Sequence, residues 1–248
     1  MPAAKQQKGP CYLCGFETTK AYMGRHLLTK HCEAADRQEC RLLKIEDENG
    51  EYWLFVDIPP SSTLSVLDKF LREVWLECCG HASAFRPLRS YAEEFRMNCR
   101  IGSFPPGTVI EYEYDFGSTT TLAVTFVGNI YREKQKTAVR VLARNYPYQF
   151  NCERCGKQAA WIDAAEWPGV MYCGACAEEV GDDGYLLPIV NSPRMGVCGY
   201  CGEFDKFGYK GISKAKKDST APDGSEKRTK KNAESKKTGS GAQGNRRV

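Results

Sequence analysis

The clearest alternation of hydrophobic and polar positions lies in the middle of the chain. Strand-forming residues alternate with polar ones over Glu39–Ile45 and Tyr52–Ile58, which is typical of strands with one buried face. Residues 47–50 (Asp-Glu-Asn-Gly) lie between them and favour a tight turn, so the two runs predict a β-hairpin. Pro59 and Pro60 then end the pairing, because proline has no backbone N–H to donate.

The spacing of apolar residues next changes to steps of three and four, which predicts a helix. Ser62 or Thr63 precedes it as a cap, and Gly80 follows it as a C-terminal cap. Its apolar face consists of Leu64, Leu67, Leu71, Val74, Trp75 and Cys78.

A second hairpin follows after the turn at residues 105–107 (Pro-Pro-Gly). Val109–Tyr114 and Thr120–Val127 are its strands, and residues 115–118 (Asp-Phe-Gly-Ser) form its turn, for which we expect Gly117 at positive φ. A last strand is expected at Ala138–Ala143. Two hairpins, a helix and a final strand predict an α+β fold, with a helix packed on a mostly antiparallel sheet as an α/β roll.

Thirteen cysteines change this picture, because eight of them occur in close C-x-x-C pairs. The odd count argues against a closed set of disulfides, and such pairs indicate metal binding in a reducing compartment. Residues 1–10 are polar and basic, without the apolar stretch of a signal peptide, and no run is long enough for a membrane span. We therefore expect a cytoplasmic protein with no membrane partner.

The first metal motif resembles a Cys2His2 finger. Cys11 and Cys14 are followed after eleven residues by His26, and after four more by His31. The usual finger has twelve residues in the middle, so this one is a residue short. His31 is the preferred fourth ligand and Cys32 is the alternative. Without a metal these thirty residues have almost no core of their own.

The second motif is a set of four cysteines near the C-terminus. Cys152 and Cys155 form one pair, and Cys173 and Cys176 form another seventeen residues later. Four thiolates close the coordination shell of zinc, which indicates a structural site. Residues 198–201 hold a further C-x-x-C pair, interpreted as a spare pair or as a replacement for one of the others. The sequence thus predicts two zinc ions, one at each end.

Catalytic alternatives exist but are poorly supported. Cys78 and His81 bring a thiol and an imidazole together, as a nucleophile pair would, but a buried helix end is the better interpretation, because Cys78 lies on the apolar face. Residues 115–117 (Asp-Phe-Gly) copy the kinase metal motif without the other kinase loops, so a hairpin turn is the better interpretation. No catalytic residue is predicted.

Positive charge is concentrated at the C-terminal end. Residues 211–248 hold eleven Lys or Arg against four Asp or Glu, whereas the whole chain has a net charge of +4, so the rest is mildly acidic. A tail of this composition is expected to be disordered and to bind phosphates or only to aid solubility. In the finger, Arg25 is the one strong base reader among the expected contact positions. The candidate nucleic-acid contacts are Arg25, Lys216, Lys217, Lys227, Arg228, Lys230 and Lys231.

Three segments together resemble a known family. They are residues 70–81 (FLREVWLECCGH), 112–118 (YEYDFGS) and 191–200 (NSPRMGVCGY). They resemble the plasmid pRiA4b ORF-three-like family, also known as insertion-element passenger proteins, over roughly residues 38–200. The resemblance implies a compact α+β roll in a prokaryotic, cytosolic protein and hints at mobile elements, but it implies no established activity.

These observations predict four parts: residues 1–36 as the Cys2His2-like finger, 37–146 as the α+β domain, 147–205 as a zinc-ribbon-like module with four cysteine ligands, and 206–248 as the tail. The expected function is a non-enzymatic zinc-binding adaptor. DNA or RNA would be contacted weakly by the finger and tail, and a protein partner by the α+β domain. The alternatives are an enzyme or enzyme subunit acting on nucleic acid, with a pocket near His81 and Asp115, and a pure protein-interaction module.

Overall fold

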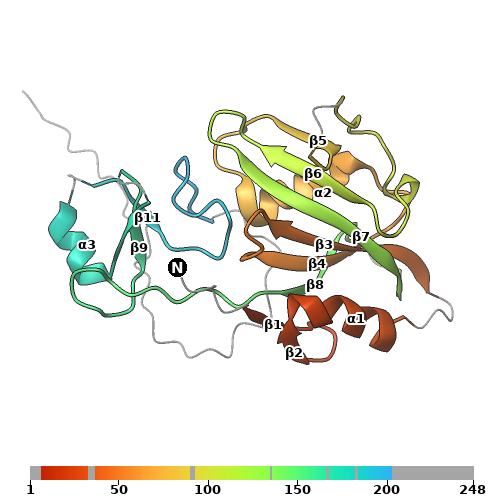
Figure 1. Ribbon diagram of the computed structural model, residues 1–248, viewed down its shortest axis with the longest axis horizontal. Helices are drawn as coiled ribbons and strands as arrows, with labels where there is room; N and C mark the ends of the chain where they lie inside the picture. Colours follow the sequence, from red (N-terminus) through yellow and green to blue (C-terminus); the bar gives the residue numbers. More distant parts are fainter. Residues whose placement is uncertain are drawn as a thin grey trace, which may run out of the picture. The chain divides into compact units, whose positions relative to one another are not determined.

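The computed structural model describes residues 7–32, 37–89, 93–134, 136–165, 168–181 and 184–202. All of them belong to one compact unit, Met1–Lys210, and the second unit, Gly211–Val248, lies outside the described residues. The described part confirms the predicted α+β class, with helices and mostly antiparallel sheets (Figure 1).

The main sheet has six strands in the order β5-β6-β7-β3-β4-β8, and every neighbouring pair is antiparallel. Both predicted hairpins are present, as β3–β4 and β6–β7. The last strand lies close to its expected place, whereas β5 was not predicted. The strands are β3 (Gln38–Asp47), β4 (Trp53–Ile58), β5 (Ser83–Pro87), β6 (Val109–Tyr114), β7 (Thr120–Arg132) and β8 (Arg140–Arg144).

One face of this sheet is covered by helix α2 (Leu64–Leu71), which begins after Thr63 as predicted. The predicted continuation to Cys78 is wrong, because a π-helical turn (Arg72–Leu76) follows and the chain leaves it in an extended conformation at Glu77. The wider turn places three successive side chains, Val74, Trp75 and Leu76, in the core. A short 3-10 helix (Ile101–Ser103) packs against the same cluster.

The other face is covered by helix α1 (Lys20–Lys30), which follows the small hairpin of β1 (Lys8–Pro10) and β2 (Glu17–Thr19). Met23 and Leu27 of α1 pack against Trp53 and Phe55 of β4. All six residues of β4 are therefore buried, and the expectation of one buried face is wrong for this strand. Gly24 lies inside α1 because a Cβ there would come within 3.2 Å of the Phe55 ring.

A separate three-stranded sheet, in the order β10-β9-β11, follows the main sheet. Its strands are β9 (Trp161–Asp163), β10 (Val170–Tyr172) and β11 (Leu186–Pro188), and helix α3 (Gly174–Val180) lies between the last two in sequence. Across the residues that the structure describes, no helix is long and apolar enough to cross a membrane.

Trp75→Ala should lower the free energy of unfolding by about 3–5 kcal/mol, because the indole is fully buried beneath the sheet and its loss leaves a cavity. Urea unfolding of the full chain measures this change. Leu88→Ala is the control, since Leu88 is 42% exposed and its truncation should change stability by less than about 0.5 kcal/mol. Equal effects of the two variants would contradict this description of the core.

Candidate metal centres

The first centre brings together the four residues of the N-terminal motif. The donor atoms of Cys11, Cys14, His26 and His31 all lie within 4.8 Å of one another. Cys11 Sγ is 3.6 Å from His31 Nε2, and Cys14 Sγ is 3.3 Å from His26 Nε2. In a zinc tetrahedron, neighbouring donor atoms are about 3.5–3.8 Å apart, so this spacing fits the ion.

Local structure explains how these four residues meet. The Gly15 N–H donates to the Cys11 carbonyl, with Gly15 at φ 79°, so the chain folds back around both thiols. His26 lies one turn before the end of α1, and His31 is its C-cap. The Phe16 ring stacks on His26 with 4.6 Å between centroids.

The electrostatics of the two imidazoles suit a metal ligand. Burial lowers the pKa of His26 and of His31, and Lys30 and His26 respectively add to the effect. A neutral imidazole has a lone pair available for a metal. Cys32 is exposed and lies outside the cluster, so the geometry brings in His31 rather than its alternative.

Cys40, which follows the first motif in the sequence, belongs to the core. Its side chain is fully buried on β3 among the residues beneath α1. Burial raises the pKa of the Cys40 thiol to about 11, so it stays protonated at neutral pH.

The second centre contains the four cysteines of the C-terminal motif, whose sulfurs also lie within 4.8 Å of one another. The first pair forms a turn in which the Gly156 N–H donates to the Cys152 carbonyl, with Gly156 at φ 71°. Cys173 is the N-cap of α3, so the second pair begins a helix. Cys155 Sγ is 3.5 Å from Cys173 Sγ.

The charges of this centre favour a bound cation. Burial opposes the ionisation of Cys152, but backbone hydrogen bonds from Cys173, Cys155 and Arg154 outweigh it and lower the pKa of Cys152 to about 6. The hydrogen bond with the Cys173 thiol raises the pKa of Cys176 to about 12. Four such sulfurs become thiolates together only when a cation offsets their charge, as Zn²⁺ does.

A third cluster was not expected. Cys78, Cys79 and His81, from the loop after the π-helical turn, meet Cys198 with all donor atoms within 4.8 Å. His81 Nε2 is 3.0 Å from Cys79 Sγ and 3.2 Å from Cys198 Sγ. Cys198 thus lies apart from the four-cysteine centre, against a loop more than a hundred residues earlier in the chain.

Asp115 lies behind the third cluster, in the turn between β6 and β7. Its Oδ1 is 3.5 Å from His81 Nδ1, and its Oδ2 accepts a 2.5 Å hydrogen bond from the buried Arg194 guanidinium. The hydrogen bond from Arg194 lowers the pKa of Asp115, so the carboxylate stays ionised. The left-handed residue of this turn is Asp115, at φ 63°, and the expectation for Gly117 is wrong.

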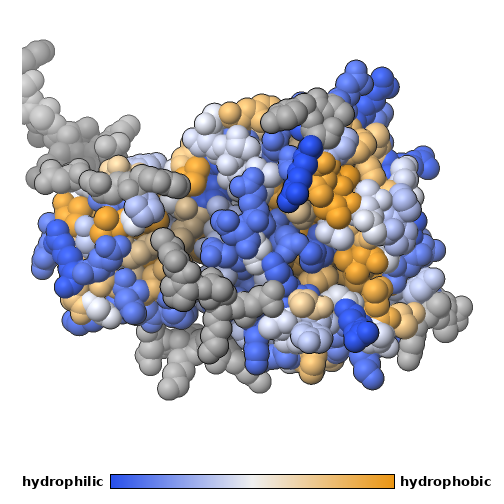
Figure 2. All heavy atoms as spheres, in the orientation of Figure 1, coloured by the Kyte–Doolittle hydropathy of each residue, from blue (hydrophilic) through white to orange (hydrophobic). Residues whose placement is uncertain are grey.

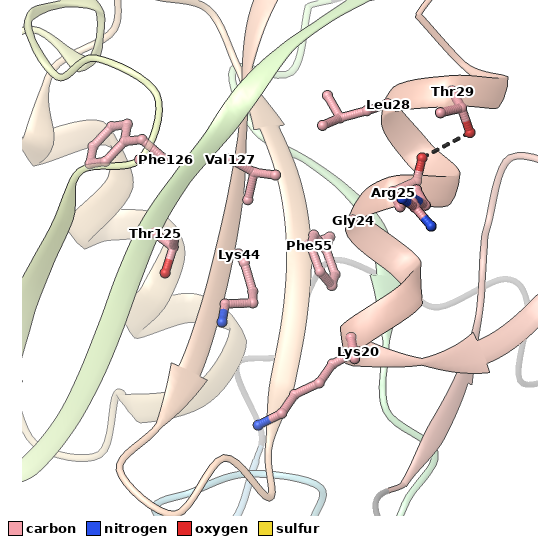
Figure 3. Close-up of a pocket in the computed structure, with 12 residues that line it drawn as sticks. Lys20, Gly24, Arg25, Leu28, Thr29, Lys44, Phe55, Thr125, Phe126 and Val127 are labelled. Carbon is pink, nitrogen blue, oxygen red and sulfur yellow. Dashed lines mark hydrogen bonds between the residues drawn. The ribbon is translucent and has the colours of Figure 1, made fainter.

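The candidate nucleic-acid residues fall into two groups. Arg25 is exposed on α1, whereas Lys216, Lys217, Lys227, Arg228, Lys230 and Lys231 lie outside the described residues. Arg25 borders an open groove of about 580 Å³ between α1 and the main sheet, where Lys20 and Lys44 also lie (Figure 3). Phe55 and Val127 form its apolar floor.

Cys173→Ser should remove one zinc ion and unfold the C-terminal module, because a structural metal supplies most of the folding energy of such a small unit. Elemental analysis measures the zinc, and hydrogen exchange should accelerate within residues 150–188 while β3 and β4 stay protected. Cys99→Ser is the control, since Cys99 lies outside all three clusters. Unchanged zinc content in Cys173→Ser would rule out this centre.

His31→Ala should likewise remove one zinc ion, whereas Cys32→Ser should remove none. The reason is that only His31 has its donor atom among those of Cys11, Cys14 and His26. Zinc measured per mole of purified full-length protein decides between the two residues. Loss of zinc in Cys32→Ser with retention in His31→Ala would reverse the assignment.

Comparisons with known proteins add little to this geometry. No family model and no curated protein matches the chain. Among solved structures it is similar to a protein of unknown function, MM3350, from Methanosarcina mazei Go1. The two are 16% identical, with a TM-score of 0.38 over 48% of this chain and 75% of that chain. The likeness assigns no activity or ligand, and membership of the ORF-three-like family stays a prediction.

Proposed function

We propose that the protein is a non-enzymatic, zinc-stabilised adaptor that contacts DNA or RNA weakly through α1 and its basic tail. The observation that carries the proposal is the completeness of the two expected centres, each of which assembles four Cys or His donors. Four protein ligands close the shell of zinc, leaving no position for a reacting water. Zinc at these centres therefore holds short segments in place.

The residues considered for catalysis are engaged in structure. Asp115 pairs with Arg194 and faces His81, and His81 lies among three thiols. A general base has to reach a substrate proton, and these contacts occupy the atoms that would do so. The surroundings of His81 and Asp115 thus favour an adaptor over an enzyme.

The exposed side of α1 supports nucleic-acid contact. Met23 and Leu27 are buried against the sheet, which leaves Tyr22 and Arg25 facing solvent on the other side of the helix. An arginine reads a guanine edge or binds a phosphate, and an exposed tyrosine ring can stack on an unpaired base.

The neighbouring groove adds positive charge. Lys20 and Lys44 both form ion pairs with Glu46, so two ammonium groups share one carboxylate and a net positive charge remains. Figure 3 shows both lysines and Arg25 around the groove. Phosphate oxygens are suitable occupants of such a surface, and the attraction is independent of base sequence.

A protein partner is the second candidate, favoured by apolar side chains on the finger. Leu13, Phe16 and Tyr22 are 37%, 50% and 63% exposed. Figure 2 shows apolar and hydrophilic residues intermixed on the visible face of the molecule. Tyrosine and phenylalanine are enriched where protein surfaces meet.

Binding to random-sequence oligonucleotides tests the proposal. The slope of log K against log salt should be about −0.9 per neutralised phosphate on duplex DNA. Deleting residues 211–248 should remove most of that slope, and Arg25→Ala should change it by about one unit at most. Fluorescence anisotropy between about 50 and 200 mM salt measures these slopes on duplex and single strands.

Lys69→Ala is the matched control, since Lys69 is an exposed cation on α2, far in sequence from the finger. It should leave the slope unchanged. If full-length and truncated protein bind every strand equally weakly at low salt, nucleic-acid contact fails and the protein-interaction function takes its place.

A further inference from the structure

The third cluster has the donor set of a zinc site. We propose that Cys78, Cys79, His81 and Cys198 bind a third zinc ion, which fastens the C-terminal segment 191–198 to the α+β domain. Three thiolates and one imidazole are soft ligands that select zinc in tetrahedral geometry. The sulfur–sulfur distances of 3.5 Å for Cys79–Cys198 and 3.6 Å for Cys78–Cys79 are close to the roughly 3.8 Å expected across such a tetrahedron.

The loop that carries three of the ligands is held in place by its own hydrogen bonds. The Glu77 carboxylate accepts from the Gly80 N–H at 2.6 Å and from the Tyr114 hydroxyl at 3.2 Å. Arg72 donates to the His81 carbonyl at 2.6 Å. Gly80 has φ 76°, which brings His81 back toward the two cysteines. These contacts hold Cys78, Cys79 and His81 together in one loop.

A carboxylate orients the imidazole. Asp115 faces Nδ1 of His81, so Nε2 is the nitrogen directed at the thiols. Metal-bound histidines commonly have a carboxylate at the other ring nitrogen, because it holds the tautomer and the ring orientation. The His81 ring also packs edge-on against Tyr114, with 5.7 Å between centroids.

The fourth ligand reaches the cluster through an anchored segment. Ser192 donates to the Trp75 carbonyl at the end of the π-helical turn, and Arg194 binds Asp115, Ser118 and Thr120. A short distance after Arg194, the chain turns with Cys198 at φ 50°, a conformation that costs energy in a non-glycine residue. That backbone places the Cys198 sulfur beside Cys79 and His81.

The site belongs to the structural class because its four ligands come from the protein. Two lie on adjacent residues of a loop and one lies 119 residues away from Cys79, so a bound ion closes a long loop of chain. Residues 191–198 contact the domain through buried polar groups, and zinc would add a metal-dependent link to that contact.

Native mass spectrometry of the zinc-loaded full-length protein tests the count. We expect three zinc ions in the natural chain, two in Cys198→Ser and three in Cys201→Ser. The second variant is a matched control, because Cys201 belongs to the same C-x-x-C pair but lies outside the cluster. Cys198→His should restore the third ion, since an imidazole also binds zinc. The same number of ions in Cys198→Ser as in the natural chain would overturn the proposal.

Cysteine alkylation tests the third zinc site in the natural chain, without a substitution. Cys79 and Cys198 are exposed, so iodoacetamide should label both after chelator treatment and neither in the zinc-loaded protein. Cys32 is exposed and belongs to none of the three clusters. It should therefore react in both states and serves as the control for reagent activity. Equal labelling of Cys198 with and without zinc, or a Cys79–Cys198 disulfide in the purified protein, would refute the third site. The losses of zinc from Cys173→Ser and His31→Ala are independent of this result.

Discussion

The buried ion pair between Arg194 and Asp115 is the contact that anchors residues 191–198 to the main sheet. Arg194 has no exposed surface, and removing a guanidinium from water is costly unless other acceptors replace the water. Asp115, Ser118 and Thr120 supply those acceptors, all from the β6–β7 turn and the start of β7. Because Asp115 also faces His81, one carboxylate anchors the segment and orients an imidazole. Substituting either partner would leave the other charge buried and unpaired.

The two expected metal centres differ in how much apolar core surrounds them. Cys11 is buried beside β8, and Met23 and Leu27 insert into the core beneath α1, so the N-terminal segment has apolar support that does not depend on a metal. At the other end, the buried cluster within the four-cysteine module consists of Cys152, Cys173 and Cys176, with Tyr172 packed against it. Besides these sulfurs the module buries only a few apolar side chains, such as Ile162 and Leu187, so it would depend more heavily on a bound ion.

Local sequence patterns predicted the elements whose conformation depends on neighbouring residues. They failed where the conformation or the contact depends on residues far away in the sequence. The steps of Leu64, Leu67 and Leu71 gave the helix correctly, because helical packing repeats along the chain. The same steps continue through Val74, Trp75 and Cys78, but a π-helical turn forms there, because it buries Val74, Trp75 and Leu76 in succession. The third cluster escaped for the same reason: Cys198 and Cys79 share no spacing rule across 119 residues. The signal available in the sequence was that residues 78–81 contain three of the four soft ligands that a zinc site requires.

The three clusters have the composition of structural metal sites, which stabilise the fold, rather than of catalytic sites. A catalytic zinc keeps an open position, whereas each of these groups offers four donors for one ion. Binding of a nucleic acid or a protein would therefore involve surfaces outside the clusters. Under the proposed function that surface would be the solvent side of α1 and the groove beside it, where Lys20 and Arg25 of α1 lie near Lys44 of β3. Metal in the first centre would tie the C-terminal part of α1, through its two histidines, to the two cysteines that precede the helix. Under the proposed function, zinc binding and nucleic-acid binding would then be coupled through one helix.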